Sequence, residues 1–189
     1  MHLAILGSTN GTDMQAIIDA IEAKQLDAKI EIVISNKADA HILERAVKHG
    51  IKNLYIDGSK KSREEYDELV MAELKKYPID LILLIGYMRI LSEPFVQAFP
   101  DQILNVHPSL LPAFAGGMDK NVHAQVLKSG AKNSGCSIHF VDEGVDTGKV
   151  LLQKKCKIEP GETVESLKNK VQKLEGEAFI EVIKMLANK

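Results

Sequence analysis

The sequence predicts a single-domain α/β fold with a mostly parallel β-sheet and an antiparallel pair of strands near the C-terminus. Through the first two-thirds of the chain, short apolar runs alternate with longer segments of helical periodicity. This order is typical of βαβ units with right-handed crossovers. In the last third, two strand-like runs follow each other with no helix between them, which favours antiparallel pairing.

The first predicted strand covers residues 2–6 and ends in a polar turn that contains glycine. Apolar residues then recur with helical spacing from Met14 to Ile21. Thr12 and Gln15 have the spacing of a capping box that would begin this helix. The segment therefore predicts a strand, a turn and a helix in that order.

The later elements follow from the same two periodicities, and Ser62 with Glu65 has the spacing of a second capping box. The further predicted strands cover residues 28–35, 52–56, 81–85, 103–107, 137–141 and 150–158. Three further helices are predicted between these strands: one contains Leu43 and Val47 and ends at Gly50, one begins at Ser62 and ends before Pro78, and one begins at Ser92 and contains Val96. Two more are predicted over residues 122–128 and 164–187.

Composition excludes several classes of protein. The 24 Lys and Arg residues nearly balance the 26 Asp and Glu residues, which argues against a strongly basic nucleic-acid binder. Two cysteines cannot form a disulfide framework, and no CxxC pair suggests zinc. Without an apolar run of about 18–20 residues or room for a signal peptide, we expect a cytoplasmic protein with no membrane or nucleic-acid partner, either a monomer or a weak homodimer.

The first turn is a candidate anion site. Backbone N–H groups of Gly11, Thr12 and Asp13 would lie at a helix N-terminus, where they and the helix dipole favour a phosphate. The turn has neither the GxGxxG pattern nor a Walker lysine, so an ordinary βα turn remains the alternative.

Asn105 and His107 form the most informative polar pair. They lie two residues apart near the carboxyl end of a predicted central strand, so their side chains share one face of the sheet. Ligands bind at this end of open α/β sheets. The pair is either a satisfied structural pair or a preorganised set of donors for a developing oxyanion.

Two irregular segments lie near this end of the predicted sheet. Residues 108–120 contain Gly116 and Gly117 and resemble a loop that could move over a site. Residues 86–91 could form a wall for a flat aromatic ligand, although Met, Ile and Leu are more often plain core.

The acids of residues 142–148 could serve the same site. Any one of them is more often a turn residue than a catalyst, but an acid that reaches His107 would fix its orientation and stabilise its protonated form. A metal site with His107, His123, His139 and an acid is a weaker alternative, because no pair has HxH or HxxxH spacing. We expect His123 and His139 to be structural.

Residues 105–112, NVHPSLLP, together with Asp146 in a DxG loop, resemble the folate-dependent formyltransferases. The segments NGT at 10–12, SNKADA at 35–40, GYMRILS at 86–92 and VQKLE at 171–175 are similar to the phosphoribosylglycinamide formyltransferases among them. The resemblance covers nearly the whole chain and implies a Rossmann-like formyltransferase fold.

The resemblance implies transfer of a formyl group from 10-formyltetrahydrofolate to the amine of 5-phosphoribosylglycinamide, without a metal. It assigns catalysis to Asn105, His107 and Asp146. It assigns the ribotide substrate to Gly11, Thr12, Asp13, Gln172, Lys173, Leu174 and Glu175. It assigns the folate to Arg63, Met88, Arg89, Ile90, Leu91, Asn105, Asp142, Glu143, Gly144, Val145 and Asp146.

The sequence departs from the family pattern in three places. Asp13 stands where Asn is common, and its side chain is expected to face away from the phosphate and cap the helix. Lys149 replaces the proline after Gly148, and residues 114–121 lack the usual pattern, so no contacts are assigned to them.

Three alternatives remain for the function. A formyltetrahydrofolate hydrolase would share the catalytic trio but usually carries an N-terminal regulatory domain. A methionyl-tRNA formyltransferase adds a C-terminal RNA-binding domain. A catalytically silent phosphosugar- or folate-binding module would not need the trio at all.

Overall fold

The computed structural model describes residues 1–117 and 120–188, and contacts group the chain into two compact units, Met1–Leu104 and Asn105–Lys189. The first unit contains β1 (His2–Gly7), α1 (Thr12–Glu22), β2 (Lys29–Ser35), α2 (His41–Lys48), β3 (Asn53–Tyr55), α3 (Arg63–Leu74), β4 (Leu81–Ile85) and α4 (Glu93–Ala98). β5 (Ile103–His107) crosses the boundary between the units. The second unit continues with α5 (Lys120–Lys128), β6 (Asn133–Phe140), β7 (Val150–Lys157) and α6 (Val164–Ala187).

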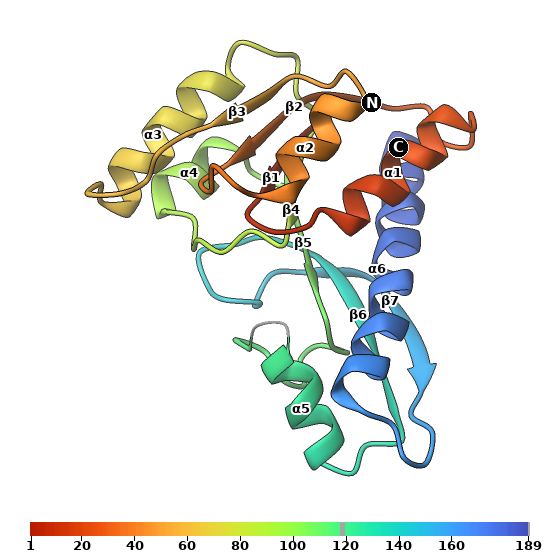
Figure 1. Cartoon of the computed structure of the whole chain (residues 1–189). Helices are drawn as coiled ribbons and strands as arrows, with labels where there is room; N and C mark the ends of the chain where they lie inside the picture. The colour runs from red at the N-terminus through yellow and green to blue at the C-terminus, as the bar shows by residue number, and fades with distance from the viewer. Residues whose placement is uncertain (118–119, 189) are drawn as a thin grey trace. The chain divides into compact units, whose positions relative to one another are not determined.

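The strands follow the order β3-β2-β1-β4-β5-β6-β7, and Figure 1 labels them. In the first unit, β1 pairs in parallel with both β2 and β4, and β2 pairs in parallel with β3. This confirms the predicted parallel sheet. Since β2 and β4 flank β1 on opposite sides, the order of the sheet reverses there, and the loops after β1 and β4 leave it at the end where α/β proteins bind ligands.

Hydrophobic burial explains why β1 and β4 occupy the middle of the first unit. Leu3, Ala4, Ile5 and Leu6 in β1 have no exposed surface, and all residues of β4 are buried. Strands covered on both faces require such continuous apolar runs. The apolar sequence of these strands therefore determines their central position.

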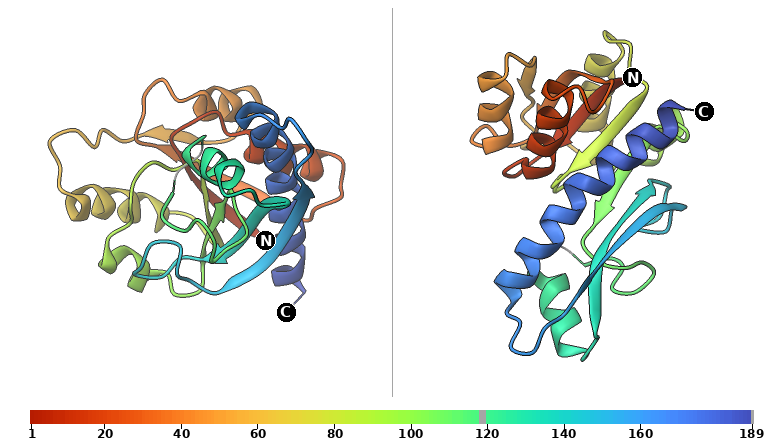
Figure 2. Two further views of the ribbon diagram at one scale, coloured as in Figure 1. Left: turned by 90° about the horizontal axis from the view of Figure 1, so that it is seen from below. Right: turned by 90° about the vertical axis from the view of Figure 1, so that its right-hand side faces the viewer.

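In the second unit, β6 and β7 pair antiparallel, as predicted, and Ile138 lies opposite Leu152. Helix α6 packs on both strands and on α5, and both views in Figure 2 show it running beside the strand pair. Val171 and Phe179 of α6 have no exposed surface. Their periodic spacing provides the apolar side of the helix that covers the strands.

β6 begins at Asn133, four residues before its predicted start. The hydrogen-bonded register with β7 continues to the pair Asn133 and Lys157. Main-chain pairing accepts polar residues and glycine, so the apolar pattern alone placed the start of this strand too late.

The two predicted capping boxes have different outcomes. The box at α3 is confirmed: the Ser62 hydroxyl accepts from the Glu65 N–H at 3.1 Å, and the Glu65 carboxylate accepts from the Ser62 N–H at 2.8 Å. The box predicted for Thr12 and Gln15 is wrong. The N-cap of α1 is Gly11, and no side chain caps the helix.

Gly11 is required by its backbone and by its surroundings. Its φ of 67° lies in the left-handed region that favours glycine. A Cβ atom there would lie 2.5 Å from Cγ1 of Ile42. The tight turn therefore replaces a side-chain cap at the start of α1.

Candidate functional site

The strand β5 carries Asn105 and His107 into the second unit, where Asn105 contacts His139 of β6 and His107 contacts Asp146 of the loop after it. His107 Nδ1 lies 3.1 Å from Asp146 Oδ2, and the two side chains are 3% and 10% exposed. The predicted trio of Asn105, His107 and Asp146 thus lies in one cluster: His139 contacts both Asn105 and Asp146.

Asp146 is held as a carboxylate by several donors. Burial acts to raise the pKa of Asp146, but hydrogen bonds from His107 and the Gly116 N–H, together with the nearby His139 ring, outweigh it and hold that pKa well below the usual aspartate value. The Gly116 N–H lies 2.8 Å from Oδ2. The cluster therefore contains a permanent negative charge at neutral pH.

Both nitrogens of the His107 ring face acceptors. Nε2 lies 2.9 Å from the backbone carbonyl oxygen of Phe114, while Nδ1 faces Asp146. A carbonyl oxygen and a carboxylate can only accept, so this arrangement suits the doubly protonated imidazolium. Phe114 has a φ of 61°, an unusual conformation for a residue with a side chain.

His139 is the residue of the cluster that the sequence analysis missed. Its Nε2 lies 3.2 Å from Asn105 Nδ2 and 3.5 Å from Asp146 Oδ1, and its side chain is 3% exposed. The available signal was the alternation of β6, which places His139 and Ser137 on one face. That pattern does not distinguish a buried core histidine from one that contacts a site.

The loop that carries Asp146 is held by its own polar groups. Asp142 Oδ1 accepts from the Gly144 N–H at 3.1 Å and from the Thr147 hydroxyl at 2.6 Å. Residues Asp142, Glu143, Gly144 and Val145 are exposed, and Asp146 itself has a φ of 57°. The internal bonds of the loop stabilise the unusual conformation that turns Asp146 inward.

The beginning of the irregular segment after β5 is anchored in the second unit. The Ser137 hydroxyl donates to the Ser109 carbonyl at 2.7 Å, and the Gln153 amide donates to the Leu111 carbonyl at 2.9 Å. Ser109 in turn donates to the Ala113 carbonyl. Of the loop predicted at 108–120, residues 118 and 119 lie outside the described part of the chain.

In the first unit, the predicted anion site lies at the N-terminus of α1, where the backbone of Gly11, Thr12 and Asp13 begins the helix. Two hydrogen bonds from Arg45 of α2 stabilise this turn and the first turn of α1. Arg45 Nε donates to the Asn10 carbonyl at 2.7 Å, and another nitrogen of Arg45 donates to Gln15 Oε1 at 2.9 Å.

Ser8 links three loops at the carboxyl ends of β1, β2 and β4. Its N–H donates to the Gly86 carbonyl, its hydroxyl donates to Asn36 Oδ1 at 2.5 Å, and the same hydroxyl accepts from the Met88 N–H at 2.9 Å. No sequence motif pointed to Ser8. The contacts span up to 80 residues of sequence, so no local pattern reports them.

Asp13 does not cap α1, contrary to the prediction. Its side chain is 5% exposed, and Oδ1 has no hydrogen-bond partner among the described residues. Burial raises the pKa of Asp13 to about 7. A carboxyl in this position is therefore neutral over the acidic range and ionises near neutral pH.

The predicted wall after β4 combines exposed apolar side chains with a stacked arginine. Met88 and Ile90 are 43% and 52% exposed, whereas Leu91 is buried. The Arg89 guanidinium lies 4.1 Å above the ring of Tyr66, a residue of α3 with no exposed surface. Arg63, at the start of α3, is half exposed and 3.9 Å from Glu64.

The four predicted substrate residues of α6 lie on one turn in the second unit. Lys173 is exposed, whereas Gln172, Leu174 and Glu175 are half-buried. The trio, residues 142–146 and the turn of α6 belong to the second unit, whereas the anion site, Arg63 and the apolar wall belong to the first.

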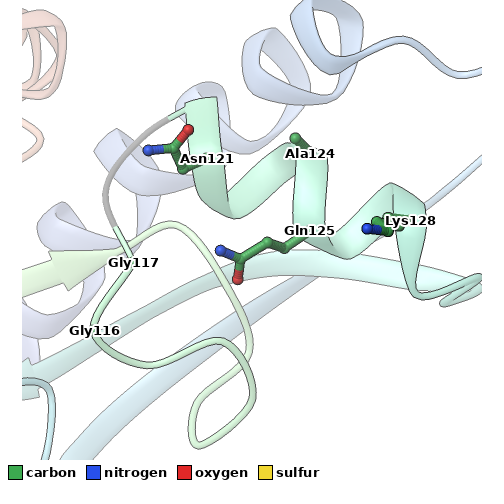
Figure 3. Close-up of a pocket in the computed structure, with 6 residues that line it drawn as sticks. All are labelled: Gly116, Gly117, Asn121, Ala124, Gln125 and Lys128. Carbon is green, nitrogen blue, oxygen red and sulfur yellow. The ribbon is translucent and has the colours of Figure 1, made fainter.

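A hollow in the second unit lies between the loop at Gly116 and helix α5, as Figure 3 shows. Its lining residues are Gly116, Gly117, Asn121, Ala124, Gln125 and Lys128. Gly116 lines the hollow and also donates its N–H to Asp146 of the cluster. Among the lining residues that the structure describes, Lys128 alone is charged.

Over 1–117 and 120–188, no group of three or more His, Cys, Asp or Glu side chains is arranged to hold a metal ion. In the same parts of the chain, no helix is both long and apolar enough to cross a membrane.

Comparison with known proteins identifies the family. A family model described as formyl transferase matches residues 1–183. The chain belongs to the formyl transferase family. It is 39% identical over 189 residues to the phosphoribosylglycinamide formyltransferase of Escherichia coli (strain K12), an alignment that covers 100% of this chain and 88% of that protein.

Solved structures of formyl transferases have the same fold. The crystal structure of glycinamide ribonucleotide transformylase 1 from Symbiobacterium toebii matches with a TM-score of 0.94 and 39% identity, covering 100% of this chain and 88% of that chain. The human trifunctional purine biosynthetic protein adenosine-3 is 40% identical over 188 residues. That match covers 99% of this chain, which spans 18% of the human protein. The predicted formyltransferase fold is thereby confirmed.

Proposed function

We propose that this chain transfers a formyl group from 10-formyltetrahydrofolate to the amine of 5-phosphoribosylglycinamide, a step of purine biosynthesis. Both substrates are small molecules. The observation that carries the proposal is the cluster of Asn105, His107 and Asp146 in a member of this family. Relatives that are covered over most of their length bear the name of this activity.

The chemistry of the cluster suits acyl transfer to an amine. The amine attacks the formyl carbon, a C–N bond forms, and the carbonyl oxygen becomes an oxyanion. Asn105 donates an N–H to this oxygen without a change in charge, and His107 donates a charge-assisted hydrogen bond or a proton. The oxyanion then re-forms the carbonyl, the bond between the formyl carbon and N10 of the folate breaks, and the proton that the attacking amine loses passes through water to N10.

Asp146 supports this step through His107. Its carboxylate faces Nδ1, so the ring is oriented and its positive form is stabilised while Nε2 acts as the donor. In the structure, the Phe114 carbonyl oxygen lies 2.9 Å from Nε2, at the position where the oxyanion would accept its hydrogen. The segment that carries Phe114 must therefore withdraw from His107 before the oxyanion forms.

Substrate binding is assigned to the remaining groups. The N–H groups of residues 11–13 would hold the ribotide phosphate at the helix N-terminus, and residues 172–175 of α6 would contact its ribosyl-glycinamide part. Arg63, residues 88–91 and the loop at 142–146 would bind the folate. The exposed apolar side chains of Met88 and Ile90 suit a flat pterin ring.

One assay tests the function directly. The purified protein is mixed with 10-formyltetrahydrofolate with and without 5-phosphoribosylglycinamide, and formyl folate consumption and formylated ribotide are measured. Consumption that requires the ribotide supports transfer. Equal consumption without the ribotide would indicate a hydrolase, and no consumption would indicate a silent binding module.

A further inference from the structure

We infer that His139 is a positioning residue that orients the Asn105 amide toward the reacting carbonyl oxygen. The inference deepens the proposed function, because Asn105 is the uncharged oxyanion donor there. It starts from the position of His139, which is 2% exposed and lies on β6 beside the cluster.

The tautomer of His139 follows from its backbone partner. His139 Nδ1 lies 2.8 Å from the carbonyl oxygen of Phe140. Since a carbonyl oxygen only accepts, Nδ1 must carry a hydrogen, and in the neutral ring the lone pair is then on Nε2. His139 therefore presents an acceptor to Asn105, the nearer of its two neighbours at 3.2 Å, and gives no hydrogen to Asp146 Oδ1, which lies 3.5 Å from the same nitrogen.

That acceptor faces the Asn105 amide. Nε2 lies 3.2 Å from Asn105 Nδ2, within hydrogen-bonding distance. One Nδ2 hydrogen is donated to His139, which leaves the second hydrogen for the oxyanion. An amide that rotates about its side chain would present its oxygen to the oxyanion for part of the time, so this bond selects the productive orientation.

The Phe140 carbonyl is itself held in place. The Phe140 N–H donates to the Lys149 carbonyl at 3.0 Å. A Cβ atom at Gly148 would lie 1.8 Å from the Phe140 carbonyl oxygen, so only glycine permits this approach. The chain of contacts thus runs from Gly148 to Phe140, then to His139 and Asn105.

Two substitutions of similar size separate the two ring nitrogens. His139→Gln keeps a polar group at the position of Nε2, where its oxygen accepts from Asn105. His139→Asn keeps a donor near Nδ1 but is too short to reach Asn105. We expect kcat to fall about 100-fold in His139→Asn and less than about 5-fold in His139→Gln, with KM nearly unchanged in both, because the affected bond strengthens in the transition state.

A double variant tests whether His139 acts through Asn105. Asn105→Ala combined with His139→Asn should be no slower than Asn105→Ala alone, since the amide that His139 orients is already gone. A purely structural role would make the two losses multiply. Multiplicative losses, or equal losses in His139→Gln and His139→Asn, would overturn the inference.

A measurement on the unmodified protein does not depend on activity or on folded variants. Nitrogen NMR of His139 should show a protonated Nδ1, an unprotonated Nε2 and a coupling across the hydrogen bond to Asn105 Nδ2. A protonated Nε2, in either the neutral or the doubly protonated ring, would refute the inference. If the protein fails to transfer formyl groups but shows this coupling, the proposed function fails while the positioning contact stands.

Discussion

His107 Nδ1 and Asp146 Oδ2 lie 3.1 Å apart, and both side chains are nearly buried. The Asp146 carboxylate lies beside Nδ1, and Nε2 lies on the opposite side of the ring. This lets His107 donate through Nε2 while its orientation is fixed from behind.

Replacing Asp146 by asparagine should slow the reaction without unfolding the protein. The amide occupies the same volume but no longer stabilises a positive His107 ring, so we expect kcat to fall at least about 100-fold. Steady-state kinetics and circular dichroism check this result. The exposed change Glu68→Gln serves as the control, and unchanged turnover in Asp146→Asn would remove the acid from the mechanism.

Asn105→Ala and His107→Ala each remove one donor to the oxyanion. We expect each variant to stay folded and to lose about 100- to 1,000-fold in turnover, with little change in the KM of either substrate. Thermal unfolding verifies the fold, and initial rates measure the loss. Wild-type turnover in a folded variant would exclude that residue from catalysis.

The lowered pKa of Asp146 predicts a specific loss of stability in acid. A carboxyl whose folded-state pKa lies below its ordinary value of 3.8 stabilises the fold above that value, and the contribution disappears as pH falls below it. The urea concentration at the midpoint of unfolding should therefore fall more steeply for the wild type than for Asp146→Asn between about pH 4 and about pH 2. Parallel pH profiles of the two proteins would contradict this prediction.

Asp13 predicts the opposite pH dependence. Its pKa is raised to about 7 by burial, so the folded state holds a proton that the unfolded state releases near 3.8, and stability falls as pH rises between these values. Asp13→Asn should gain stability over the wild type progressively across this range and keep a constant advantage at higher pH. Urea unfolding measures the gain, and the exposed Asp27→Asn should show none.

Gly148→Ala should disturb catalysis from outside the cluster. The added methyl group meets the Phe140 carbonyl, and such overpacking costs about 1–3 kcal/mol of stability. Because His139 bonds to that carbonyl, kcat should fall as well. Gly161→Asn, at a turn with open space and a φ of 79°, is the control that should retain full turnover.

Much of the fold could be predicted because neighbouring residues encode it. The continuous apolar run of β4, the helical spacing of α6 and the capping box at Ser62 are local patterns with local physical causes. The prediction failed at Thr12, where the left-handed Gly11 begins the helix in place of a side-chain cap. It also failed at the start of β6, where pairing with β7 decides the boundary.

The sequence by itself determined the alternating strands and helices, the position of Asn105 and His107 at a strand end, and the family through its motifs. Only the tertiary structure decided that His139 contacts Asn105, 34 residues away. The same holds for the hydrogen bonds of Ser8 with Asn36 and Met88, which lie 28 and 80 residues from it in the sequence. Backbone preferences and side-chain periodicity act between near neighbours, whereas hydrogen bonds between distant residues exist only after the chain has folded.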